Sequence, residues 1–367
     1  MLMEVAQNSI AQLDIERPVG IGSRTDLYGV ADQSIKTFIN RELDDANAAE
    51  SFIWRQTNHQ RDLYPLKEEW SGVVHLARIN DIRRVNKFLE QVNRNMPEGK
   101  WLVVCVETKN SRRARVLNKF PRYISRPYYA LDFVLKRVLP KWKPTRKIYF
   151  GITGGRNRVI SYTEAIGRLF SCGFEVKNTV RIGYNTYILA KKVDKPSYDM
   201  EPTYGALIRL NRVGKGGEKI TVYKLRTMHP YSEYAQEYVF EQNNLQNGGK
   251  LKEDFRVTGW GRIFRQLWID ELPMLYNWLK REMKLVGVRP LSSHYFSLYP
   301  EDMQELRTTV KPGLVPPFYA DMPETFEDIV ESERRYINAY HDKPIRTDIR
   351  YFFKAMYNIV IKRERSA

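Results

Sequence analysis

The chain has 367 residues, 43% of them hydrophobic, which is enough for about two folded domains and excludes an intrinsically disordered protein. Its 60 lysines and arginines against 43 acids give a formal net charge of +17, which suits anionic partners such as nucleotide phosphates, lipid phosphates or an acidic membrane. The two cysteines, Cys105 and Cys172, exclude a disulfide framework and predict a reducing compartment, most simply the cytoplasm.

Membrane-spanning character is not expected. The sequence contains no run of about 20 apolar residues, the length needed to cross a bilayer. The first residues include Glu4 and Asp14 and lack the apolar run of a signal peptide. We therefore expect a cytoplasmic protein that can meet a membrane only peripherally, on the inner face of the cell membrane.

The amino-terminal half alternates strand and helix patterns. Residues 72–77 and 101–106 are short apolar runs typical of buried strands, and residues 79–95 between them have helical spacing, which predicts a βαβ unit. A helix is expected over residues 161–171, followed by a hairpin of residues 174–180 and 186–191. We predict an α/β fold overall, with a partial Rossmann-like domain over residues 1–192. A charged linker broken by two prolines follows at 193–204, and a second domain at 205–367.

The first half resembles the carboxyl-terminal half of a class I methyltransferase over residues 70–192. A cofactor-binding domain of that kind needs a glycine-rich turn after its first strand. The one candidate, residues 19–23, follows no clear apolar strand. We therefore expect a scaffold or docking domain; a working methyltransferase would bind S-adenosylmethionine.

Residues 109–147 carry 13 lysines or arginines and a single acid, Asp132. Residues 128–142 are expected to form a short amphipathic helix, with Phe133, Val134, Arg137 and Val138 at helical spacing. Such a segment can attach peripherally to an anionic membrane surface. A solvated basic face is an equally good interpretation. The segment lacks a recognisable motif for single strands, so we expect no nucleic-acid partner.

The second half begins with a predicted hairpin. Residues 207–212 and 218–224 flank Lys215-Gly216-Gly217, and consecutive glycines supply the positive φ angles of a tight turn. Residues two apart on a strand point the same way, so Lys224 and Arg226 are expected on one face, where two cations could hold a diphosphate. The alternative is a hairpin with merely exposed basic residues.

An adjacent acid pair follows a helical pattern. Apolar residues recur at helical spacing from 262 to 272, and Pro273, which has no amide hydrogen, is expected to break the helix beside Asp270 and Glu271. A ligand could reach acids at such a junction, near Arg265. Taken alone, such a pair is more often found at a helix start, where the acids complement the helix dipole.

The motifs of this half occur in one order: the glycine hairpin, Lys224-Leu-Arg226-Thr-Met, Asp254-Phe-Arg-Val-Thr258, the acid pair before Leu-Pro273, and Gly287-Val-Arg289-Pro290. In this order, residues 205–355 resemble the bacterial sugar transferase family, the monotopic polyprenol-phosphate phosphoglycosyl transferases. The resemblance implies an α+β domain. It also implies transfer of a sugar-1-phosphate from a UDP-sugar to a polyprenyl phosphate or similar lipid acceptor, which initiates glycan assembly.

The resemblance also implies site roles. Asp270 would be the nucleophile, Glu271 would bind Mg²⁺ as the cofactor, and Arg265 would orient the acids or bind phosphate. The remaining phosphate charge would be neutralised by four basic residues: Lys224, Arg226, Arg289 and Arg212.

Three departures from the family pattern keep a second function open. The long apolar helix expected before residue 204 is replaced by the polar linker, residues 314–321 replace the family's usual sequence, and residues 229–252 are inserted. Tyr231, Tyr234 and Tyr238 of the insertion could cover the site, bind a partner or pack in a core. The alternative function is a non-catalytic paralogue that binds a nucleotide sugar or a partner transferase and regulates polysaccharide synthesis.

Overall fold

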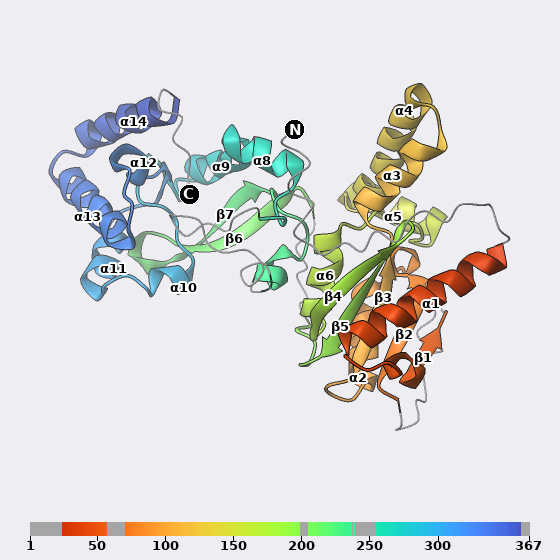
Figure 1. Ribbon diagram of the computed structural model, residues 1–367. Helices are drawn as coiled ribbons and strands as arrows, with labels where there is room; N and C mark the ends of the chain where they lie inside the picture. Colours follow the sequence, from red (N-terminus) through yellow and green to blue (C-terminus); the bar gives the residue numbers. More distant parts are fainter. Residues whose placement is uncertain (1–23, 57–69, 199–204, 237, 239–253, 361–367) are drawn as a thin grey trace. The chain divides into compact units, whose positions relative to one another are not determined.

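The computed structural model describes residues 24–56, 70–198, 205–236, 238 and 254–360, and these form two compact units (Figure 1). The first unit comprises Met1–Thr203 and His229–Tyr238, and the second comprises Tyr204–Met228 and Val239–Ala367. The segment His229–Tyr238 thus belongs to the first unit. The sequence predicted instead two domains that are each continuous in the chain, residues 1–192 and 205–367. The glycine-rich candidate at 19–23 lies outside the described residues.

A five-stranded sheet organises the first unit, with strand order β1-β2-β3-β5-β4. The first three strands are parallel, β5 runs antiparallel to β3, and β4 pairs antiparallel with β5. This confirms the predicted α/β fold, the βαβ unit and the late hairpin. The strands are β1 (Phe52–Arg55), β2 (Gly72–Arg78), β3 (Trp101–Val106), β4 (Phe174–Ile182) and β5 (Asn185–Lys192).

Strand β3 is buried along its length from Leu102 onward, as expected for a central strand with both faces covered. The helices of this unit are α1 (Arg24–Glu42), α2 (Val85–Asn95), α3 (Lys109–Lys119), α4 (Arg122–Phe133), α5 (Lys143–Thr153) and α6 (Tyr162–Ser171). Helix α2 begins later than predicted, because Ile79–Asp81 forms a separate 3-10 turn. Its apolar side chains at 85, 88, 89 and 92 are buried.

The amphipathic helix predicted over residues 128–142 is placed differently. Helix α4 starts at Arg122 and continues as a π-helical turn, Val134–Val138. Arg137 does not lie on an exposed face: it is buried and donates a hydrogen bond of 2.5 Å to Glu164. A helix is therefore present in this segment, but the prediction that Arg137 lies on its exposed face was wrong.

The second unit opens with the predicted hairpin of β6 (Leu207–Val213) and β7 (Lys219–Leu225), joined through Gly216 and Gly217 at φ values of 69° and 77°. Its helices are α8 (Gly259–Gln266), α9 (Met274–Leu279), α10 (Ser293–Phe296), α11 (Glu301–Thr308), α12 (Phe318–Asp321), α13 (Phe326–Asp342) and α14 (Pro344–Val360). Two short parallel strands, β8 (Lys284–Val286) and β9 (Gly313–Val315), complete the α+β unit.

The core of the second unit gathers where α11, α13 and α14 pack around β8 and β9, and its largest fully buried side chain is Tyr336. The Tyr336 hydroxyl donates to Asp348 at 2.6 Å and also lies 3.0 Å from the backbone oxygen of Val286. Among the described residues of the whole chain, no helix is both long enough and apolar enough to span a bilayer.

Candidate active site

A cavity in the second unit is built on one face of the hairpin. Leu210 and Arg212 of β6 and Val222 and Lys224 of β7 alternate along the strands and line this cavity together. Arg226 does not line it, because β7 ends at Leu225. The Arg226 guanidinium instead donates to the backbone oxygen of Gly205 at 2.9 Å. The expected shared face therefore holds for Lys224 but not for Arg226.

The acid pair lies on a short turn between two helices, as the predicted helix break requires. Helix α8 ends at Gln266, Trp268 adopts a left-handed φ of 59°, and Ile269–Glu271 forms a 3-10 turn before Pro273 caps α9. The break thus begins about five residues before the proline. Trp268 packs against Tyr319 with ring centroids 4.5 Å apart, so burial of the indole draws the chain out of the helix.

The two acids have different surroundings. Glu271 lines the cavity and forms an ion pair of 2.6 Å with Lys224. Asp270 is partly buried beside the cavity but does not line it. Burial raises the pKa of Asp270 and the neighbouring Glu271 carboxylate raises it further, while Lys224 and Arg265 act in the opposite direction. Asp270 therefore lies within the field of both cations.

Arg265 is held by a residue of the loop after β7 rather than by an acid. Its guanidinium donates to the hydroxyl of Thr227 at 3.0 Å. The backbone oxygen of Thr227 also accepts hydrogen bonds from Thr258, the cap residue of α8. A side chain at Gly261 would meet that oxygen at 2.0 Å, so the first turn of α8 can approach this closely only with glycine. These contacts set the position of Arg265 near the carboxyl end of α8, just before the acid turn.

Asn277 locks the hairpin to α9. It is fully buried; its amide nitrogen donates to the backbone oxygen of Thr221 at 2.7 Å and its oxygen accepts from the backbone amide of Tyr223 at 3.2 Å. Because α9 directly follows the acid turn, these two hydrogen bonds hold β7 beside that turn and bring Lys224 close to Glu271.

The loop that carries Arg289 is fixed by a contact between two glycines. A Cβ at Gly313 would lie 2.1 Å from the backbone nitrogen of Gly287, so β8 and β9 can pair only with no side chain at that position. Arg307 donates to the backbone oxygen of Arg289 at 2.6 Å and forms a buried ion pair with Glu333. Arg289 consequently reaches the cavity beside Arg212.

An aromatic wall of the cavity escaped the sequence analysis. Phe318 and Tyr319 line the cavity with Leu314 and Pro316, and the Arg289 guanidinium lies 5.8 Å from the centre of the Phe318 ring. The signal was available, since these residues fall within 314–321, where the chain departs from the family sequence. The cavity thus combines three cations and one acid with an aromatic side.

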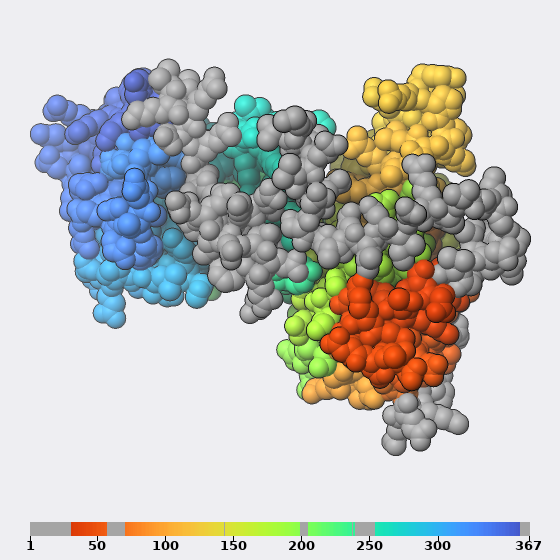
Figure 2. Space-filling view, viewed as in Figure 1, coloured from red at the N-terminus to blue at the C-terminus, as the bar shows by residue number. Residues whose placement is uncertain are grey.

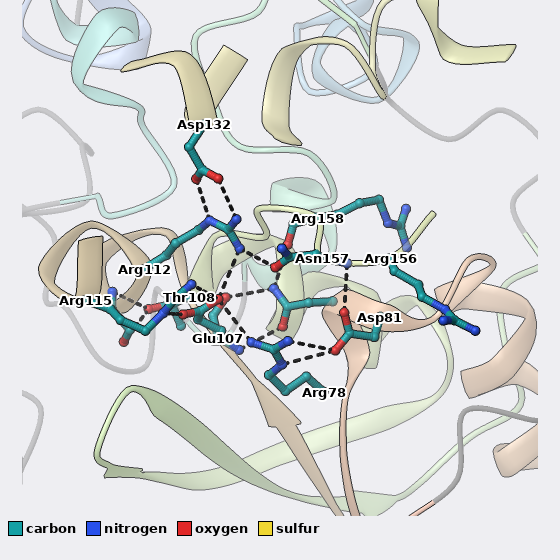
Figure 3. Close-up of polar contacts among 12 residues, drawn as sticks. Arg78, Asp81, Glu107, Thr108, Arg112, Arg115, Asp132, Arg156, Asn157 and Arg158 are labelled. Carbon is teal, nitrogen blue, oxygen red and sulfur yellow. Dashed lines mark hydrogen bonds and ion pairs between the residues drawn. The ribbon is translucent and has the colours of Figure 1, made fainter. Parts of the chain in front are cut away.

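Open α/β sheets bind cofactors at the carboxyl ends of their parallel strands. In the first unit this edge lies at the carboxyl ends of β1, β2 and β3. Figure 3 shows that ion pairs fill this edge. Glu107, which follows β3 and is 1% exposed, is engaged by Arg78, Arg112 and Arg115 at 3.3, 3.2 and 2.5 Å.

Two further acids complete this network. Arg112 also binds Asp132 of α4 with two hydrogen bonds of 2.6 and 2.7 Å, and Arg78 pairs with Asp81 at 3.0 Å. Every acid of the network is therefore matched by an arginine, which supports a scaffold role for this edge.

A unit of mixed sheet and helix, with a cationic cavity beside a partly buried acid turn, has the architecture of a phosphate-handling domain. Residues 198–362 match the family model described as bacterial sugar transferase. This half of the chain is a bacterial sugar transferase domain, as the sequence motifs indicated.

Similar proteins agree with the family match. The chain is 33% identical over 139 residues to a galactosyl transferase, CpsE, of Streptococcus agalactiae, covering 37% of this chain and 31% of that protein. It is 30% identical over 160 residues to the undecaprenyl-phosphate galactose phosphotransferase of Salmonella typhimurium, covering 42% and 33%. It is 40% identical over 111 residues to a UDP-glucose:undecaprenyl-phosphate glucose-1-phosphate transferase of Caulobacter vibrioides, covering 30% and 38%. The match spans only about a third of each relative.

Proposed function

We propose that the second unit transfers a sugar-1-phosphate from a UDP-sugar to a polyprenyl phosphate, or a similar lipid phosphate, and so initiates glycan assembly. The observation that carries this proposal is the cavity that gathers Arg212, Lys224, Arg289 and Glu271 beside Asp270. Arginine and lysine side chains that converge on one cavity suit a diphosphate. The named relatives act in the same reaction class.

Asp270 is the proposed nucleophile. Its carboxylate oxygen would attack the sugar-linked phosphorus, forming an acyl phosphate bond while the bond to the bridging oxygen breaks and UMP leaves with that electron pair. A phosphate oxygen of the acceptor would then attack the same phosphorus and free Asp270. Arg265 would orient Asp270, and Arg226 would contribute positive charge from outside the cavity.

The acid turn fits a divalent cation. Asp270 and Glu271 are adjacent carboxylates. Burial is the largest cause of the raised pKa of Asp270, and the negative charge of Glu271 is the next. A cation bound there would relieve the repulsion between the two carboxylates. Mg²⁺ is typically held by one or two carboxylates together with substrate phosphates. Glu271 would hold it, and the ion would neutralise phosphate charge. Lys224, now paired with Glu271 at 2.6 Å, would then be released to face the diphosphate.

A lipid acceptor requires apolar surface near the acid turn. Helices α8 and α9 and the segment between them carry exposed apolar side chains. These are Trp260, Ile263, Leu267, Leu272, Leu275, Trp278 and Leu279. We therefore place the reaction at a membrane surface, reached peripherally from the cytoplasmic side.

The test is UMP release by the purified chain with Mg²⁺, polyprenyl phosphate and a panel of UDP-sugars. We expect release with at least one donor and its loss in Asp270→Asn. The matched control is Asp302→Asn, which removes an exposed acid of α11 in the same unit and should leave the rate unchanged. Release by Asp270→Asn at the wild-type rate, or no release with any donor, would favour the non-catalytic regulator instead.

A further inference from the structure

A row of exposed apolar side chains follows α4 of the first unit and the turn after it. Six residues recur at spacings of four and three and form what we call the α4 stripe: Ile124, Tyr128, Leu131, Leu135, Val138 and Trp142. Their exposed fractions run from 39% at Leu135 to 59% at Trp142. Within α4 this spacing places the side chains on one side of the helix. Figure 2 shows the atoms of α4 standing out from their own unit.

Two buried ion pairs hold the opposite side of this segment. Asp132 accepts two hydrogen bonds from Arg112, and Arg137 donates both to Glu164 and, at 2.8 Å, to the backbone oxygen of Val159. Glu164 is 2% exposed, so this anchor lies inside the unit. The stripe therefore faces outward because Asp132 and Arg137, which lie between its members, are tied inward.

Cations flank the stripe in the chain, and residues 109–147 contain a single acid. Arg122 and Arg126 are exposed on α4, and Lys119 is exposed just before it. Asp132, the one acid in residues 109–147, is already bound by Arg112. The outer surface of this segment thus combines aliphatic and aromatic side chains with uncompensated positive charge.

We propose that the α4 stripe docks on an anionic lipid surface, with its apolar side chains in the interfacial region and its arginines at the headgroups. This combination of charges disfavours a second copy of the chain, since Arg122 and Arg126 would face like charges. Four of the six members, Ile124, Leu131, Leu135 and Val138, are aliphatic and provide no stacking surface for nucleic-acid bases, which favours lipid. The proposal goes beyond the transferase reaction and does not depend on it.

The test places an environment-sensitive fluorophore on the full chain through Leu131→Cys. Cys105 and Cys172 are buried, so the introduced thiol is labelled selectively. With vesicles of phosphatidylcholine and phosphatidylglycerol we expect a blue-shifted, brighter emission, and with phosphatidylcholine alone a much smaller change. The control is a label at Val193→Cys, which replaces another exposed apolar residue of the same unit and should not respond.

Charge is tested separately with Arg122→Gln and Arg126→Gln. Each is expected to weaken binding to the anionic vesicles about fivefold, the equivalent of about 1 kcal/mol per basic residue. A label at position 131 that does not respond to anionic vesicles, whether or not the protein sediments with them, would overturn the proposal. So would a lipid-independent shift that grows with protein concentration, which would assign the stripe to a second copy.

Discussion

Asp270 differs from an ordinary surface aspartate in its surroundings. Burial is the larger cause of its raised pKa, and Glu271 is the next. A nucleophilic carboxylate must be ionised, so activity should fall as pH decreases through this raised pKa, at a higher pH than for a free aspartate.

The variant Glu271→Gln separates the effect of burial on the pKa of Asp270 from the effect of the Glu271 charge. Removing the neighbouring negative charge should move the acidic limb of the pH profile to lower pH, even though the maximal rate also falls. The measurement is the pH dependence of UMP release, each variant being normalised to its own maximum. A limb that stays in place, or moves to higher pH, would show that Asp270 ionisation does not control the profile.

Some site residues could be predicted locally and others could not. The double glycine at 216–217 predicted the hairpin, and Pro273 predicted a break beside the acids, because both signals act through their own backbone. The left-handed Trp268 and the cavity-lining Phe318 depend on packing between segments about 50 residues apart. The inward turn of Arg137 likewise depends on Glu164, which lies 27 residues away.

At the scale of elements, the segment His229–Tyr238 belongs to the first unit although it continues directly from Met228 of the second unit. The Tyr231 ring lies 4.4 Å from the Arg168 guanidinium of α6, and burial lowers the pKa of His229 to about 3, so its imidazole is neutral. A Cβ at Gly167 would lie 2.2 Å from the backbone oxygen of Tyr231. The insertion is thus packed core in part, rather than a free loop.

The variant Gly167→Val tests this packing. The added side chain would collide with backbone, so we expect a loss of unfolding free energy of about 2 kcal/mol or more. Gly151→Ala is the matched control, because a Cβ on this α5 glycine meets nothing within 4 Å and a helical alanine stabilises by about 0.5–1 kcal/mol. Equal denaturation midpoints for Gly167→Val and the wild type would contradict the packing described here.

At the scale of the whole molecule, the chain joins an α/β unit with a five-stranded sheet to a sugar transferase domain. The apolar runs of β2 and β3 and the hairpin of β4 and β5 predicted four strands of the sheet from the sequence, whereas β1 was not predicted. The ion-pair network at its carboxyl edge was not, because Glu107, Arg78 and Asp132 come together only in three dimensions. The sequence therefore predicted most of the sheet, but not the ion pairs that occupy the edge where such sheets bind cofactors.

Because arginines match every acid at that edge, we expect the first unit not to bind S-adenosylmethionine. Isothermal titration of the full chain with the cofactor should give only the heat of dilution. Saturable binding in the micromolar range would show that the edge opens to a ligand and that the first unit has an activity of its own.

The central claim is that Asp270 carries the phosphosugar between donor and acceptor. The most direct measurement is intact-protein and peptide mass spectrometry after incubation with Mg²⁺ and a competent UDP-sugar in the absence of acceptor. We predict a mass increase of one sugar phosphate on the peptide that contains Asp270, removed by polyprenyl phosphate and missing in Asp270→Asn. Steady turnover without such an adduct, or an adduct on another residue, would contradict the account.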